Sequence, residues 1–194
     1  MKRLARALLG RLVADYRINW ILACSVPPQE PGEEAVRIDA AIMEQLAASP
    51  TPKMRGSLSY ARAGLQGLAL VSSGAPVCVA HFATPGQYGR DGTWPLRDGE
   101  IALMDIATEE AMRGRGHAVR LIEAAGRHYL GRGRSRLVAF VWWSNSPSLR
   151  AFAKAGWRRI GLSLEWQRKG RWHALHLPLS RRFASTACEA GAVR

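Results

Sequence analysis

Cysteine is scarce in this chain of 194 residues, which contains only Cys24, Cys78 and Cys188. An odd number of widely separated cysteines argues against a disulfide framework and is typical of a reducing compartment, so the default prediction is a cytoplasmic protein. No two of the three stand at C-x-x-C or any other metal-ligand spacing. The sequence therefore predicts neither a disulfide scaffold nor a metal site.

Long apolar runs are also missing, since no stretch approaches the roughly 18 uninterrupted apolar residues that indicate a membrane-spanning helix. The first residues are basic, but Arg11 and Asp15 interrupt their apolar stretch, which argues against a secretion signal. Within residues 1–16, leucines recur at helical spacing and predict a basic amphipathic helix. We expect this helix to dock on the rest of the protein, with a position on an anionic membrane surface as the alternative.

Acidic residues are too few to balance the basic ones, because 28 Lys and Arg stand against 15 Asp and Glu and give a net charge of +13. Only Lys2, Lys53, Lys154 and Lys169 are lysines, so arginine carries almost all of the positive charge. Such a surface attracts phosphates, nucleic acid or anionic membranes. The arginines are dispersed, however, so we favour solvated arginine-rich faces over a dedicated nucleic-acid site.

No linker or internal repeat divides the chain. We therefore expect one mixed α/β domain over residues 17–184, preceded by the helix of residues 1–16 and followed by a flexible tail over residues 185–194. The expected strands are 17–26, 66–72, 75–84, 99–108, 135–144, 157–167 and 171–180, and the expected helices are 32–49, 54–65, 117–130 and 146–156. Residues 85–99 are rich in turn-forming residues and predict a loop.

The strand expected at 135–144 is apolar almost throughout, which indicates a strand that is covered on both faces. Its residues Trp142 and Trp143 are expected to pack in the core. In the helix that follows, Ser146 is the expected N-cap and Gly156 the expected closing residue.

The turn from Arg113 to Ala118, Arg-Gly-Arg-Gly-His-Ala, lies between an expected strand and an expected helix. The first amides of a helix are unpaired and, together with the helix dipole, attract anions. Gly114 and Gly116 keep side chains out of the approach and can adopt positive φ, while Arg113 and Arg115 add positive charge. These properties predict a site for a diphosphate group. Glycine-rich basic turns are common, so the context of the turn decides its meaning.

The same turn resembles the coenzyme A signature of GNAT acyltransferases, Arg/Gln-x-x-Gly-x-Gly/Ala, which the chain fills with Arg113, Gly116 and Ala118. The segment Asn-Ser-Pro-Ser-Leu-Arg-Ala-Phe-Ala-Lys-Ala-Gly-Trp resembles a second motif of the family. Its matching positions are Asn145, Ser148, Lys154, Gly156 and Trp157. The resemblance extends from Arg17 to Leu179 and includes the order of helices and strands.

The resemblance implies the GNAT fold, an α/β (α+β) domain whose mixed central sheet of about seven strands is splayed in the middle and covered by helices on both faces. It also implies acetyl-coenzyme A as the cofactor, with the pantetheine arm in the gap between the strands at 99–108 and 135–144. The acceptor is expected on the opposite side, near the early helices and Tyr88. The residues implied to bind the cofactor are Ile106, Ala107, Thr108, Arg113, Gly114, Arg115, Gly116, His117, Ala118, Asn145, Ser148 and Phe152.

Acetyl transfer to an amine requires a neutral amine, whereas an ammonium with a pKa of about 10.4 is protonated at neutral pH. A base is therefore needed, and the resemblance points to Glu100, with Asp105 as second choice. Where many family members carry a tyrosine that protonates the departing thiolate, this chain has Phe152, which cannot donate a proton. A water, another hydroxyl such as that of Ser148, or no specific acid must serve instead.

The leading prediction is thus an acyl-coenzyme A-dependent N-acyltransferase that acetylates a primary amine on a small molecule, a peptide or a protein. Three alternatives are an acetyltransferase acting on aminoacyl-tRNA, a catalytically silent acyl-coenzyme A-binding domain, and a basic nucleic-acid-binding protein. A homodimer, and weak contacts of the basic surface with tRNA or an anionic membrane, are also left open. The sequence does not identify the acceptor, because its pocket comes from the loops and early helices, whose motifs are the weakest.

Overall fold

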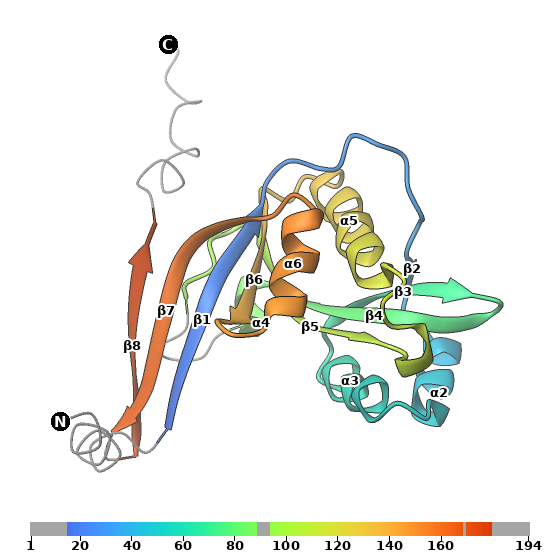
Figure 1. Ribbon diagram of the computed structural model, residues 1–194, viewed down its shortest axis with the longest axis horizontal. Coiled ribbons are helices and arrows are strands. Elements are labelled where there is room, and N and C mark those ends of the chain that lie inside the picture. The colour runs from blue at the N-terminus through green and yellow to red at the C-terminus, as the bar shows by residue number, and fades with distance from the viewer. Residues whose placement is uncertain (1–14, 89–93, 169, 180–194) are drawn as a thin grey trace.

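A computed structural model describes residues 15–88, 94–168 and 170–179 of the chain (Figure 1). The strands are β1 (Asp15–Cys24), β2 (Val36–Arg37), β3 (Gln66–Ser72), β4 (Ala75–Ala83), β5 (Glu100–Thr108), β6 (Arg136–Trp142), β7 (Arg158–Arg168) and β8 (Arg171–Pro178). The helices are α2 (Ala40–Ala48), α3 (Pro52–Arg62), α4 (Pro85–Tyr88), the 3₁₀ turn η1 (Glu110–Met112), α5 (His117–Leu130) and α6 (Ser146–Lys154). The strands form one sheet in the order β2-β3-β4-β5-β6-β1-β7-β8.

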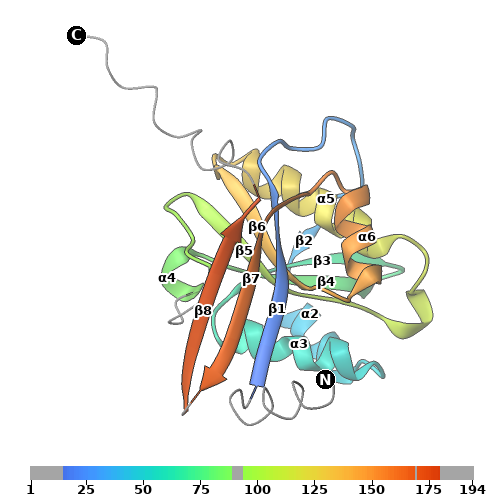
Figure 2. The same ribbon diagram turned by 60° about the vertical axis from the view of Figure 1, so that its left-hand side comes forward.

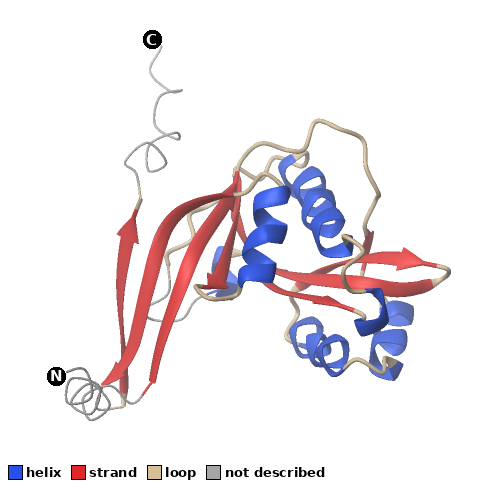
Figure 3. Cartoon of the chain, viewed as in Figure 1, coloured by secondary structure: helices blue, strands red, loops and turns tan. Residues whose placement is uncertain are grey.

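The sheet opens in its middle, between β5 and β6 (Figure 3). These two strands form the parallel pair of the sheet, from Glu100 opposite Arg136 to Leu103 opposite Ala139. Beyond Leu103, β5 continues along β4 to Thr108, whereas β6 continues along β1 to Trp142. The strands therefore diverge, which confirms the splayed sheet that the family resemblance implied.

Helices cover both faces of the sheet, α5 and α6 on one face and α2 and α3 on the other (Figures 1 and 2). The larger core lies under α5 and α6, where the rings of Phe82 and Tyr129 lie 4.7 Å apart. The smaller core lies under α2 and α3 and contains the fully buried Leu46 and Met54. Burial of these apolar side chains removes them from water and holds the helices against the sheet.

Most of the expected elements are confirmed. The first hairpin turns at Ser73 and Gly74, whose φ angles of 52° and 78° are those of a two-residue turn that matches the twist of its strands. The helix at 117–130 is present with its predicted ends, and Leu121, Ile122 and Ala125 are buried on its inner side.

Three expectations in the first half are wrong. The helix expected at 32–49 begins only at Ala40, because Asp39 caps it by accepting a hydrogen bond from the Ile42 amide at 2.9 Å. Val36, whose spacing fits a helix, instead pairs with Ala69 as part of β2. This short strand raises the expected seven strands to eight. The loop expected at 85–99 contains the one-turn helix α4.

Two expectations in the second half are also wrong. Asn145, not Ser146, caps α6, because its side chain accepts from the Ser148 amide at 3.3 Å. Trp142 and Trp143, at and just after the end of β6, are 38% and 51% exposed and so do not pack in the core.

The expected N-terminal helix and C-terminal tail fall largely outside the described residues. Residues 1–14 and 180–194 are not described, while Asp15 and Tyr16, expected at the end of the helix, belong to β1. Among the described helices, none is long and apolar enough to cross a membrane.

Removal of the Asp39 cap should destabilise α2. We expect Asp39→Ala to lower the free energy of unfolding by about 1 kcal/mol, because one amide of the first turn loses its acceptor. Glu44→Ala on the exposed face of the same helix is the control and should change stability by less than about 0.5 kcal/mol. Urea unfolding measures both, and an equal effect of the two substitutions would contradict the cap.

His81 predicts a pH-dependent stability. The His81 ring is fully buried, and neither ring nitrogen has a hydrogen-bond partner among the described residues. Burial lowers the pKa of this ring below 6.5, although the negative charge of Asp105 opposes the shift. As the pH falls, the unfolded chain therefore binds a proton at His81 more readily than the folded state does. The free energy of unfolding should decrease as the pH drops below about 6.5.

We expect His81→Phe to reduce this loss of stability between about pH 7.5 and pH 5.5, measured by urea unfolding at each pH. A smaller dependence should remain, because burial also lowers the pKa values of His117 and His128. His173→Gln, which removes an exposed ring, is the control. A pH dependence identical to that of the unmodified protein would exclude His81 as a source.

Candidate functional site

The turn before α5 leaves the first amides of that helix available. Gly116 is the N-cap with φ of 81°, Gly114 has φ of 76°, and no side chain caps the helix. A Cβ atom at Gly114 would meet nothing within 4 Å, and one at Gly116 would meet only Arg120 Nη1 at 3.6 Å. Glycine is thus required by the positive φ angles and not by crowding within the protein, and it leaves the helix end open to an anion.

A first cavity of about 640 Å³ lies in front of this turn, between β5, α5 and α6. Every residue expected to bind the cofactor lines it, from Ile106 on β5 to Phe152 on α6, except Arg115. Lys53, Arg113, Arg150 and Lys154 also line it, and none of its described lining residues is an aspartate or a glutamate. The cavity therefore combines an open helix end with four cations, which suits a polyanionic ligand.

Sequence reasoning missed Lys53 and Arg150 as lining residues. Lys53 lies on α3, more than fifty residues before the glycine turn, and no local pattern connects the two segments. Arg150 falls at a variable position inside the second motif, so the motif does not select it.

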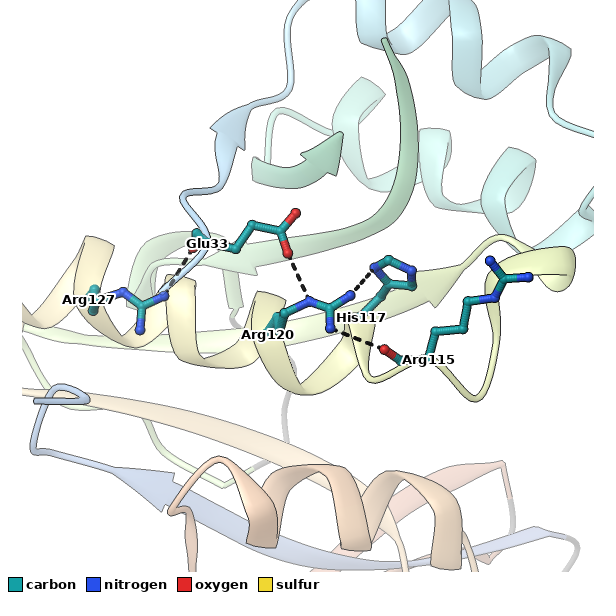
Figure 4. Close-up of polar contacts among 5 residues, drawn as sticks. All are labelled: Glu33, Arg115, His117, Arg120 and Arg127. Carbon is teal, nitrogen blue, oxygen red and sulfur yellow. Dashed lines mark hydrogen bonds and ion pairs between the residues drawn. The ribbon is translucent and has the colours of Figure 1, made fainter. Parts of the chain in front are cut away.

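Arg120 ties the glycine turn to a distant segment of the chain (Figure 4). Its guanidinium donates to the Arg115 carbonyl at 3.2 Å, to His117 Nδ1 at 2.8 Å and to Glu33 Oε2 at 2.8 Å. Glu33 lies between β1 and β2, and its carbonyl accepts from Arg127 Nη2 at 3.0 Å. Charge-assisted bonds of this length are among the stronger hydrogen bonds, so the network holds the turn in one conformation.

His117 is neutral in this network. Burial, followed by the charge of Arg120, lowers the pKa of its ring. Because a guanidinium only donates, Nδ1 must accept and the ring proton sits on Nε2. His117 is the first residue of α5 and lines the cavity, while its ring accepts a hydrogen bond from Arg120. Arg115 does not line the cavity; instead, its carbonyl accepts a hydrogen bond from the same guanidinium.

Glu100 is buried at the start of β5, and its carboxylate lines neither the first cavity nor the second one described below. It forms an ion pair with Arg136 and accepts a hydrogen bond from the Arg97 amide at 3.0 Å. Asp105 is also buried and forms an ion pair with Lys53. Both carboxylates predicted as bases are thus held by cations.

Two predicted residues of α6 keep their expected places beside the first cavity. Phe152 is buried and packs edge-on against Trp157, with ring centroids 4.8 Å apart. Ser148 lines the same cavity from the first turn of the helix. A hydroxyl is therefore present on this wall although Phe152 supplies none.

A second cavity of about 370 Å³ is lined by Leu103 and Met104 of β5, where β6 departs, and by Phe140 of β6. Its other lining residues come from β1, α3 and the turn after it, α4 and β7: Arg17, Asn19, Tyr60, Leu65, Gln87, Tyr88 and Glu165. Met104 lines the second cavity and Ile106 the first, so the two cavities adjoin β5 within three residues.

Comparisons with known proteins agree with this architecture. The profile of the acetyltransferase (GNAT) family matches residues 57–157, which is just over half of the chain and includes the glycine turn. Among curated proteins, none matches the sequence.

Solved structures of similar fold are distant in sequence. A GNAT-family protein from Novosphingobium aromaticivorans has 18% identity and a TM-score of 0.58, over 87% of this chain and 67% of that one. A GNAT acetyltransferase from Colwellia psychrerythraea has 13% identity and a TM-score of 0.54, over 85% of this chain and 61% of that one. The chain thus spans about two thirds or less of these two proteins.

The structure of AAC(6')-Ib with ribostamycin and coenzyme A has 17% identity and a TM-score of 0.53, over 82% of this chain and 100% of that one. At such identities the likeness concerns the fold alone, and it agrees with the family match over residues 57–157. By its sequence profile and its splayed sheet, the chain belongs to the acetyltransferase (GNAT) family.

Proposed function

We propose that the protein is an acyl-coenzyme A-dependent N-acyltransferase that transfers acetyl from acetyl-coenzyme A to a primary amine. The observation that carries the proposal is the uncapped N-terminus of α5 beside a cavity lined by four cations and no described acid. Coenzyme A is a polyanion with a diphosphate, and such a group suits a helix end with open amides. The structure of AAC(6')-Ib with coenzyme A supports the same cofactor for this fold.

The residues of the first cavity fit the parts of the cofactor. Gly114, Gly116 and Ala118 leave room for the diphosphate at the helix end, with Arg113 beside it. Between Ile106 and Thr108, β5 pairs with β4 on one edge only, because its pairing with β6 stops at Leu103. Unpaired strand amides and carbonyls need partners, and the amides of a pantetheine arm would supply them.

The cofactor supplies an acyl thioester, and the chain must provide a neutral amine and a proton for the leaving sulfur. Glu100 stays our candidate base, with Asp105 second, and each would first have to exchange its ion pair for the amine proton. A thiol has a pKa of about 8.5, so its thiolate leaves without a strong acid. Ser148 or water can then return the proton in place of the tyrosine that Phe152 replaces.

Phe152 also supports a second candidate function, which is binding of acyl-coenzyme A without catalysis. Its ring is buried against Trp157 and contributes only apolar contact. Release of free thiol from acetyl-coenzyme A, tested against a panel of amines, peptides and charged tRNAs, distinguishes the two functions. Cofactor binding without thiol release from any acceptor would favour the silent domain.

The proposed diphosphate site predicts that Gly116→Val raises the Kd for coenzyme A at least about tenfold, because the side chain strains the turn and covers the amides. Gly133→Val is the matched control: Gly133 has a similar φ of 84°, and it lines neither cavity. Isothermal calorimetry measures both. An unchanged Kd for the Gly116 variant would refute the site.

The base assignment predicts that Glu100→Gln lowers kcat at least about 100-fold with little change in the Kd for coenzyme A. Arg136→Gln is the control, because it breaks the same ion pair but keeps the carboxylate. Both variants should lose stability, since each breaks a buried ion pair. Rates are therefore compared per folded molecule. Equal rates for the two variants would show that Glu100 serves structure alone.

A further inference from the structure

The second cavity is lined by a carboxylate that forms no ion pair within the described residues. Glu165 lines it from β7, and the Ser163 hydroxyl, at 3.3 Å from Oε1, is the partner found for its carboxylate within the described residues. No described Lys, Arg or His lies within ion-pairing distance of it.

The nearest candidate partner, Arg17, has another contact. Arg17 stands directly opposite Glu165 in the pairing of β1 with β7. Its guanidinium carbon lies 4.4 Å from the centre of the Trp172 ring, in a cation–π contact on the neighbouring strand β8. Glu165 therefore remains the one negatively charged group among the described residues that line the cavity.

Aromatic rings form much of the remaining wall. Tyr88 stacks on Phe140 with ring centroids 5.2 Å apart, and Tyr60 stacks on the buried His81 at 5.7 Å. Rings held in place by such contacts offer their electron-rich faces to a cation at little entropic cost. A carboxylate together with aromatic rings is a combination that binds an alkylammonium.

Glu165 lies far from the place where acyl transfer would occur. In the sheet order, β6 and β1 separate β7 from β5, and beyond Leu103 the strands β5 and β6 are no longer paired. The pantetheine site proposed above adjoins β5, so Glu165 is at the opposite end of the second cavity. A carboxylate that holds an ammonium also keeps it protonated, which suits a charge that does not react.

We propose that the second cavity binds an acceptor with two amines, and that Glu165 pairs with the ammonium that is not acylated. This inference rests on the proposed acyltransferase function and adds the class of its substrate, a linear or compact diamine or polyamine. The reacting amine, in its neutral form, attacks the thioester carbonyl beside Met104. The C–S bond breaks, the amine becomes an amide, and coenzyme A leaves as the thiol with the proton that the amine gives up. The second amine stays charged at Glu165.

The test compares linear diamines, from diaminopropane to diaminooctane, with amino alcohols of the same length, in which a neutral hydroxyl replaces the second ammonium. We expect the unmodified protein to show a lower KM for at least one diamine than for its amino alcohol. Glu165→Gln should raise that KM about tenfold and leave the amino alcohols unchanged, because only the diamine loses a charge-assisted bond. A KM ratio that Glu165→Gln does not change would overturn the proposal.

Two controls separate charge from folding. Glu44→Gln removes the same charge from an exposed position on α2 and should leave the KM ratio unaltered. Glu165→Asp keeps the charge and should restore part of the preference. If Glu165→Gln does not fold, the unmodified protein still tests the ion pair: diamine preference should weaken as salt rises, and a salt-independent ratio would count against the proposal.

Direct binding distinguishes this inference from the proposed function. Calorimetry with diamines in the presence of coenzyme A requires no turnover. If no amine is acetylated but Glu165→Gln abolishes diamine binding, the acyltransferase assignment is wrong and the ammonium site stands. If amines are acetylated but no diamine binds better than its amino alcohol, the ammonium site is wrong and the acyltransferase stands.

Discussion

The divergence of β5 from β6 after Leu103 and Ala139 is the constraint on which the rest of the structure depends. A strand in the middle of a sheet normally has both of its hydrogen-bonding edges occupied. Here β5 keeps one edge unpaired over the residues that line the first cavity. Because buried backbone groups need partners, this edge favours an extended ligand with amides of its own. The same opening places the two cavities within three residues of each other on one strand.

The two cavities differ in electrostatic character, because no described acid lines the first, whereas both Arg17 and Glu165 line the second. The fold assembles each cavity from distant segments. Around the first, four cations converge from α3, the glycine turn and α6 on a helix end that itself attracts anions. The second contains a carboxylate from β7 and aromatic rings from α3, α4 and β6.

The glycine turn depends on support from outside its own segment. Glycine permits the positive φ angles but also leaves the turn flexible, and Arg120 offsets this by fixing the Arg115 carbonyl and the His117 ring. Arg120 is in turn held by Glu33, which is 87 residues away in sequence. The segment between β1 and β2, which has little regular structure of its own, thereby becomes part of the proposed cofactor site.

The sequence by itself determined the parts of this protein that are encoded locally. Alternating apolar residues and turn residues predicted the hairpins, and helical spacing with glycines predicted α5 and its uncapped start. The family motifs predicted eleven of the residues that line the first cavity. Each of these signals lies within one short segment of the sequence. Only the tertiary structure decided which side chains meet. The helix α2 begins only after Asp39, because the residues before it form β2 and pair with β3. Lys53 reaches the first cavity from α3, and Arg136 pairs with Glu100 between two strands that are distant in the chain. Glu165 forms no ion pair with Arg17, which contacts the Trp172 ring instead. Contacts between segments that are distant in the chain produce no periodic pattern in the sequence, so the sequence does not predict them.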